Sequence, residues 1–328
     1  MSVREPTHAG SWYSSNSHEL HSQLAGWLTK AGEASPDGDP LPIEGLRAII
    51  APHAGYSYSG PAAGYAYKCI QPDLFKRVFI LGPSHHVYLS GCAISKCSKY
   101  TTPLGDLTID QEVNKALEKT GKFGFMSQET DEDEHSIEMH LPYVHKVFEA
   151  HLDKVKIVPI LVGALTESTE KQYGKLLAPF LHDPENLFIV SSDFCHWGQR
   201  FSYTYYADND GTVTQSLAQL PSGTGRKHSP SSPKISESIE KLDREGMEKI
   251  EEQNHSSFCR YLSRTKNTIC GRHPIGVLMS ALETIKATDE TYVTRTRFVH
   301  YAQSSSALST SDSSVSYASA FIQRKAEP

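Results

Sequence analysis

The sequence places a histidine shortly after each of three short apolar runs. The pairs are residues 46–51 with His53, residues 78–81 with His85, and residues 187–192 with His196. Such runs are typical of buried parallel strands in α/β proteins, and open α/β sheets bind ligands beyond the carboxyl ends of their strands. We therefore expect the three imidazoles to meet in one pocket, at distances that suit a metal ion.

A single histidine at a strand end is usually a hydrogen-bonded polar residue, but three at equivalent positions favour a shared site. Neutral imidazole is the commonest metal ligand, and two or three imidazoles with a carboxylate leave coordination positions open for a substrate. His85 is followed directly by His86. Because side chains alternate along an extended chain, only one of the two can point inward, and the spacing does not say which.

Two more groups could complete the site. Asp193 precedes His196 by three residues, so its carboxylate either orients the imidazole or binds the metal, or it caps the turn after the strand. Cys270 lies just before a helix expected to begin near Pro274. The helix dipole, with Arg272 and His273, would favour a thiolate there, whereas the alternative is a buried structural cysteine.

An acidic run over residues 129–134 precedes His135, Glu138 and His140. Acidic residues stabilise a helix start, and we expect this run to be solvated. His135 and Glu138 share one helical face, but the spacing is not the H-E-x-x-H zinc pattern, so a role in the pocket is secondary. Trp12, Tyr13, Tyr56 and Tyr58 could line a cleft for a tyrosine-bearing peptide or an aromatic substrate, or could simply pack. Arg272 could pair with a phosphate there.

Composition excludes several classes of protein. The chain has 328 residues and a net charge of -6, with no long basic stripe, which argues against nucleic acid as the main partner. No apolar stretch approaches the ~18 residues of a membrane span, and the first residues do not resemble a signal peptide. A cytoplasmic or nuclear location is expected, and the six cysteines are expected to be free thiols. Because the sequence shows no coiled-coil heptads, we expect a monomer. The chain lacks both a P-loop and a G-x-S-x-G elbow.

Hydrophobic periodicity predicts alternating strands and helices, and hence an α/β fold with three layers, α/β/α, around a mostly parallel, mixed sheet. The expected strands cover residues 47–51, 77–81, 156–162, 187–191, 296–302 and 315–323. The expected helices cover residues 17–30, 61–70, 109–119, 168–181, 236–253, 256–265 and 273–285. Residues 1–328 are expected to form one domain. Residues 209–235, rich in Ser, Gly and Pro, are expected to be a disordered surface insertion.

With these motifs identified, the chain resembles the Memo family, which is linked to receptor-driven cell motility. The matching segments are HAGSWY (8–13), APHAGYSY (51–58), ILGPSHHV (80–87), TDEDEHSIEMHLPY (130–143), SSDFCHWGQRF (191–201) and TICGRHPIGV (268–277). The insertion around residues 209–235 is the main departure. The resemblance implies a fold similar to class III non-haem iron extradiol dioxygenases. It places His53, His85 and Cys270 at the metal, with Asp193 and His196 beside them, and selects His85 over His86.

Those dioxygenases bind Fe(II) with two histidines and a carboxylate, so Cys270 in the third position favours iron–thiolate or copper chemistry and argues against ring cleavage. The resemblance implies a copper- or iron-binding signalling or redox protein of motility or invasive growth. Trp12, Tyr13, Tyr58 and His196 would line a groove for phosphotyrosine-type peptides. Two alternatives stay open: an active metal-dependent oxidoreductase, with His196 as general base beside Asp193, and a metal-free peptide-binding adaptor.

Overall fold

The computed structural model describes residues 2–208, 211, 213–214 and 232–325. Within these residues nine strands form one mixed sheet, in the order β10-β14-β2-β9-β3-β8-β4-β7, with β13 also paired to β14. The strands are β2 (Leu46–Ala51), β3 (Arg77–Pro83), β4 (Cys92–Ile94), β7 (Phe123–Phe125), β8 (Lys156–Val162), β9 (Asn186–Ser191), β10 (His196–Trp197), β13 (Thr294–Gln303) and β14 (Ser314–Arg324).

The centre of the sheet is parallel, and antiparallel pairing begins where β14 joins β2 and where β4 joins β8, while β4 and the edge strand β7 are parallel to each other. β2, β9, β3 and β8 run in the same direction, so their carboxyl ends share one edge. Successive side chains of these strands enter two different cores: Phe188 packs in one and Ile189 in the other. The Phe79 and Phe188 rings stack with centroids 4.5 Å apart. Apolar side chains on both faces explain why the strands read as continuous apolar runs.

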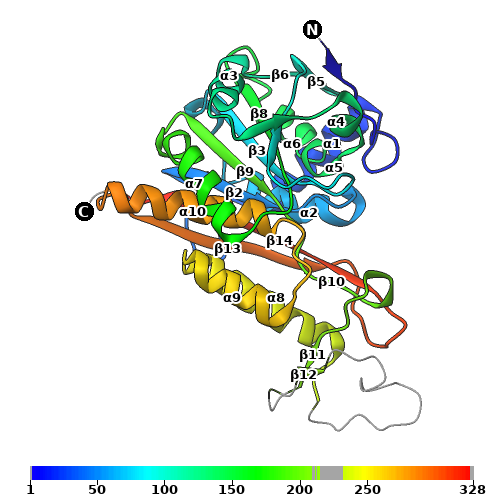
Figure 1. Ribbon diagram of the computed structural model, residues 1–328. Coiled ribbons are helices and arrows are strands. Elements are labelled where there is room, and N and C mark those ends of the chain that lie inside the picture. Colours follow the sequence, from blue (N-terminus) through cyan, green and yellow to red (C-terminus); the bar gives the residue numbers. More distant parts are fainter. Residues whose placement is uncertain (1, 209–210, 212, 215–231, 326–328) are drawn as a thin grey trace.

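Helices cover both faces, which confirms the three-layer α/β/α prediction (Figure 1). One face packs against α1 (Ser17–Lys30), α2 (Tyr56–Tyr67), α5 (His135–Glu138) and α6 (Leu141–Val147). The other packs against α3 (Gln111–Lys119), α7 (Glu167–His182), α8 (Ile235–Glu251), α9 (His255–Thr265) and α10 (Arg272–Thr288). α4 (Gln128–Asp133) and the 3-10 turns Pro72–Leu74 and Gln199–Phe201 complete the helical elements described. No helix in this part of the chain is long and apolar enough to cross a membrane.

Two small sheets lie apart from the central one. β1 (Val3–Arg4), β5 (Lys99–Thr102) and β6 (Gly105–Thr108) form the first. β11 (Tyr206–Ala207) and β12 (Val213–Thr214) form the second. The predicted insertion over 209–235 therefore contains a short strand, and Ile235 is the buried first residue of α8. Residues 209–210, 212 and 215–231 of that insertion lie outside the described residues.

The prediction that Pro61 begins a helix is wrong. α2 begins at Tyr56, five residues earlier, and Pro61 lies inside it. Proline at an interior position removes one backbone hydrogen bond. Tertiary contacts hold the first turn nevertheless, because Tyr56 is buried and its hydroxyl donates to the Met139 carbonyl at 2.7 Å.

Candidate metal centre

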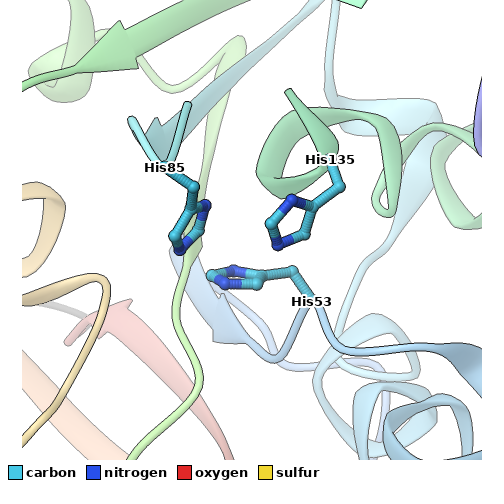
Figure 2. Close-up of side chains that lie close together, drawn as sticks. All are labelled: His53, His85 and His135. Carbon is cyan, nitrogen blue, oxygen red and sulfur yellow. The ribbon is translucent and has the colours of Figure 1, made fainter. Parts of the chain in front are cut away.

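Three imidazoles meet at the carboxyl edge of the sheet (Figure 2). His53 follows β2, His85 follows β3, and His135 is the first residue of α5. Their ring centroids lie 5.2 Å apart for His53 and His85, 5.5 Å for His53 and His135, and 4.4 Å for His85 and His135. One ligand atom from each lies within 4.8 Å of the others, a spacing from which one cation could be bound.

A buried carboxylate orients His85. Glu134 Oε2 accepts the His85 backbone N–H at 2.6 Å, and Oε1 accepts from the ring Nδ1 at 2.9 Å. Because an ionised carboxylate only accepts hydrogen bonds, Nδ1 carries a proton, and the neutral tautomer of the ring therefore presents the lone pair of Nε2. Burial opposes ionisation, yet the hydrogen bonds and charge of His85 lower the pKa of Glu134 to about 2. A carboxylate behind a histidine is the usual outer partner of a metal-binding imidazole.

A serine relay fixes the tautomer of His53. Ser191 Oγ donates its one proton to the Ser136 carbonyl at 2.7 Å, so it accepts from His53 Nδ1 at 2.5 Å. His53 Nε2 then has a free lone pair, and it lies 3.2 Å from Cys270 Sγ. Burial, followed by the charges of His85 and His135, holds the pKa of His53 well below its usual value. The ring is therefore neutral, as a metal ligand must be.

Cys270 reaches His53 from the turn between α9 and α10. The turn lies against β9: a side chain at Gly271 would place Cβ 2.3 Å from the Ser191 carbonyl oxygen. The Asp193 N–H donates to the sulfur at 3.1 Å. Burial, and next the charge of Asp193, raises the pKa of Cys270 well above its usual value, which favours the structural thiol of the two alternatives over the thiolate. Without a cation the sulfur is a thiol, and metal binding must release its proton.

Asp193 is a buried acceptor for the turn that carries His53. Its Oδ1 accepts the His53 N–H at 2.9 Å and the Ala54 N–H at 3.4 Å, and burial raises its pKa. It groups with His53 and Cys270, all three with ligand atoms within 4.8 Å. Among the described residues, therefore, two metal-type groups share His53: one includes His85 and the other Cys270.

The expectation that His196 would join His53 and His85 needs correction. Its ring contacts Phe201, with centroids 5.2 Å apart, and Nδ1 pairs with the Phe194 carbonyl at 2.9 Å. Its charge still acts on His53 and Asp193, so it lies beside the site. The third ring of the trio is His135. Burial, and next the charge of His85, lowers the pKa of His135 to about 3, and its Nδ1 is buried without a hydrogen-bond partner.

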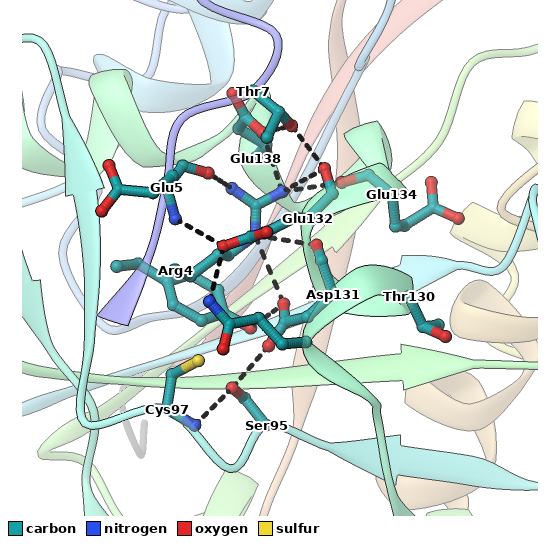
Figure 3. A network of polar contacts seen from close by, with 12 residues as sticks. Arg4, Glu5, Thr7, Ser95, Cys97, Thr130, Asp131, Glu132, Glu134 and Glu138 are labelled. Atoms are coloured by element: carbon teal, nitrogen blue, oxygen red, sulfur yellow. Dashed lines mark hydrogen bonds and ion pairs between the residues drawn. The ribbon is translucent and has the colours of Figure 1, made fainter. Parts of the chain in front are cut away.

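Part of the acidic run packs around Arg4 (Figure 3), and Asp131 and Glu134 are buried, so the prediction of a solvated helix start holds for only some of its residues. The Arg4 guanidinium pairs with Asp131 Oδ1 at 3.3 Å and Glu138 Oε2 at 2.7 Å, and donates to the Glu134 carbonyl at 3.1 Å. Glu129 and Asp133 alone in the run are exposed. The reason for the error is that a guanidinium distant in sequence compensates these carboxylates. Through it, the first strand of the chain supports the residues that orient His85.

The aromatic residues separate into two sets. The Trp12 ring lies 4.4 Å from that of His135, while the buried Tyr13 donates to Glu138 Oε1 at 2.7 Å. Both line a pocket of about 390 Å³ with Tyr56. Tyr58 instead is 62% exposed on the surface, and Arg272 lines a different pocket. The only charged side chain among the first pocket's lining residues is Glu19, so no cation there could pair with a phosphate.

These donors fit copper or iron. The free lone pairs of His53 and His85 and the sulfur of Cys270 are the imidazole and thiolate donors that suit both metals. Sequence reasoning missed Glu134 as an orienting residue and gave His135 too small a role. The signal was the Glu134-His135 dipeptide followed by apolar Ile137 and Met139, a pattern that buries this segment rather than exposing it.

Known proteins match over almost the whole chain. A model of the family described as Memo-like protein matches residues 4–321. Protein MEMO1 of Danio rerio is 51% identical over 321 residues, covering 97% of this chain and 96% of the relative. Protein MEMO1 of Homo sapiens is 49% identical over 315 residues, covering 96% and 95%. The memo-1 homolog of Caenorhabditis elegans is 44% identical over 320 residues, covering 98% and 82%.

Proposed function

The chain belongs to the Memo family, and from that premise we propose that it binds copper or iron through His53, His85 and Cys270. We propose further that it acts as a signalling or redox protein of motile cells in the cytoplasm or nucleus. The observation that carries the proposal is the convergence on His53: Cys270 Sγ lies 3.2 Å from its Nε2, and the His85 ring lies 5.2 Å from its ring.

In this proposal each residue has a defined task. His53 and His85 supply neutral imidazole nitrogens because Ser191 and Glu134 hold the protons on the opposite ring nitrogens. Cys270 supplies sulfur after losing its proton. Asp193 holds the His53 turn and donates its N–H to that sulfur. A bound copper or iron ion would supply one-electron redox chemistry. Cys270 stands where the class III dioxygenases have a carboxylate ligand, and sulfur at this position disfavours dioxygenase activity.

Metal content tests the proposal. Protein purified without added metal should contain copper or iron in close to stoichiometric amount, by mass spectrometry of the elements. The double variant His53→Ala, Cys270→Ser should lose it, while His182→Ala, a histidine half exposed on α7, should keep it. Equal, near-zero metal in parent and double variant would remove the metal from the proposal, as would unchanged metal in the double variant.

A second candidate is an active oxidoreductase. The observation that favours it is the Nδ1 contact of His196 with the Phe194 carbonyl, which leaves Nε2 as a free base beside the site. Oxygen uptake with a panel of catechols, after loading with Fe(II) under anaerobic conditions, should then depend on His196. Absence of turnover across the panel argues against this candidate.

The third element of the proposal is peptide binding at the Trp12 pocket. Since Glu19 is its charged lining residue, this pocket favours an uncharged or basic segment over a phosphate. Binding of matched tyrosine and phosphotyrosine peptides, measured with and without a chelator, tests it. Binding that survives chelation and fails in Trp12→Ala supports an adaptor role, whereas equal binding by parent and Trp12→Ala excludes this pocket.

A further inference from the structure

A second cluster of metal-type donors lies where α7, α9 and α10 meet. Glu170 Oε2 lies 2.6 Å from His255 Nε2 and 3.9 Å from Cys259 Sγ. Cys259 Sγ lies 3.6 Å from His255 Nε2. His273 Nδ1 contacts the other carboxylate oxygen, Oε1, at 2.6 Å. None of these residues contributes to the His53 site described above.

The helices are built so that these groups face one another. His255 and Cys259 are one turn apart on α9 and so share a face. Glu170 occupies space that α10 leaves empty at Gly276, where a Cβ would lie 2.4 Å from Oε2. Gly174, one turn along α7, allows the same close approach: a Cβ there would lie 2.5 Å from Ser280 Cβ. Glycine at both positions therefore lets α7 and α10 pack closely, with the Glu170 carboxylate at their contact.

We propose that Glu170, His255 and Cys259 form a binding site for a divalent cation of borderline softness, Zn²⁺ above all. His273 is a positioning residue that holds the carboxylate through Oε1. One carboxylate oxygen, one imidazole nitrogen and one sulfur are ligands that zinc takes in proteins, and three protein ligands leave a fourth position for water.

The spacing suits this cation. Tetrahedral zinc, with bonds near 2.0 Å to nitrogen or oxygen and near 2.3 Å to sulfur, separates its ligand atoms by about 3.3 to 3.6 Å. The Cys259 Sγ to His255 Nε2 distance of 3.6 Å already matches, and Sγ to Oε2 at 3.9 Å is close. Only the distance between His255 Nε2 and Glu170 Oε2, which is 2.6 Å, must increase, by about 0.7 Å, to reach the separation found around zinc.

The protonation states allow the exchange. Burial, followed by the charge of Glu170, raises the pKa of Cys259 to about 12, so the free cluster holds a thiol. Burial opposes the ionisation of Glu170, but hydrogen bonds from His255 and His273 keep its pKa below the ordinary value. When Zn²⁺ binds, the S–H bond breaks, its proton passes to solvent and a Zn–S bond forms. His255 Nδ1 has no hydrogen-bond partner, so the ring can carry its proton there when Nε2 binds zinc.

The site has an opening to solvent. A pocket of about 530 Å³ is lined by Glu170, Cys259 and His273, and also by Lys266 and Arg272. A hydrated cation can therefore reach the sulfur and carboxylate without unfolding the helices. The cationic side chains at the pocket would favour hydroxide or a small anion over neutral water as the fourth ligand.

Cobalt spectroscopy tests the site, because Co²⁺ replaces zinc and absorbs in the near ultraviolet when bound to a thiolate. The measurement uses the full chain carrying His53→Ala and Cys270→Ser, so that the first site cannot contribute. We expect a thiolate band that saturates at one equivalent of Co²⁺ and is displaced by Zn²⁺. Glu170→Gln should weaken Co²⁺ binding at least tenfold and Cys259→Ser should abolish the band. Glu167→Gln, an exposed acid one turn away in the same pocket, should leave both unchanged.

A second measurement keeps the proposal testable if a variant fails to fold. In the parent chain, Zn²⁺ should slow alkylation of Cys259 by iodoacetamide, followed peptide by peptide in a mass spectrometer. The proposal is overturned if Co²⁺ gives no thiolate band in the folded double variant. An alkylation rate at Cys259 that Zn²⁺ does not change also overturns it, and the cluster is then a hydrogen-bonded contact between three helices. Neither result bears on copper or iron at His53.

Discussion

Replacing Glu134 by Gln should damage the metal site more than the fold. The carboxylate accepts three N–H groups: the His85 backbone at 2.6 Å, His85 Nδ1 at 2.9 Å and the Ser136 backbone at 2.9 Å. An amide offers one oxygen and one NH₂, so at least one of these donors must face another donor. A buried donor without a partner costs about 1–3 kcal/mol of stability.

The same substitution acts on metal affinity separately. His85 Nδ1 loses its anionic partner, and loss of such an outer carboxylate typically lowers metal affinity about 10- to 100-fold, or roughly 1.4–2.8 kcal/mol. Competition between Glu134→Gln and a chelator of known affinity for copper gives this factor, and urea unfolding of the metal-free protein gives the stability. Glu129→Gln is the matched control, because Glu129 is exposed in the same acidic run.

The result that would refute this reasoning is specific. If Glu134→Gln loses stability but binds copper as tightly as the parent, His85 is not a ligand held by Glu134. Equal effects of Glu134→Gln and Glu129→Gln on affinity would mean that net charge, not the hydrogen bonds of His85, determines copper binding.

Three more perturbations test other parts of the structure. Gly271→Ala would force the Cys270 turn away from the Ser191 carbonyl, with a cost of about 1–3 kcal/mol in urea unfolding and weaker copper binding in chelator competition. Burial lowers the pKa of His140 to about 3, against 6.5 when unfolded, so the unfolded chain takes the proton first and stability falls as pH drops below 6.5. His140→Asn should remove about 1.4 kcal/mol of the stability lost between about pH 7.5 and 5.5. Arg4→Met leaves two buried carboxylates without their cationic partner and should lower the free energy of unfolding by about 3–5 kcal/mol in the same measurement.

The sequence was sufficient for the central strands and most helices. The runs after which His53 and His85 stand are strands β2 and β3, because burial on both faces makes their residues uniformly apolar. The sequence did not allow us to predict the burial of part of the acidic run, because that burial depends on Arg4, which lies more than a hundred residues away. Periodicity reports which face of an element is apolar, but not which distant charge compensates a buried carboxylate.

Local rules failed in a second way at the site. The position of Cys270 next to a helix start favours a thiolate, but the structure places it, partly buried, between Asp193 and His53, where desolvation opposes the dipole. For His135 the spacing indicated only a secondary role in the pocket, and it is the approach of α5 to β3 that brings its ring to His85. In both cases tertiary burial decided the outcome, and sequence spacing carries no measure of it.

Arg4 has a consequence for biosynthesis. Its carboxylate partners Asp131 and Glu138 follow it by more than a hundred residues and are therefore translated after it. A guanidinium cannot be withdrawn from water without such partners, so the amino-terminal strand must wait, hydrated, until that segment has emerged. A nascent chain stopped before residue 131 would expose this strand to proteases, whereas one released after the acidic run could begin to shield it.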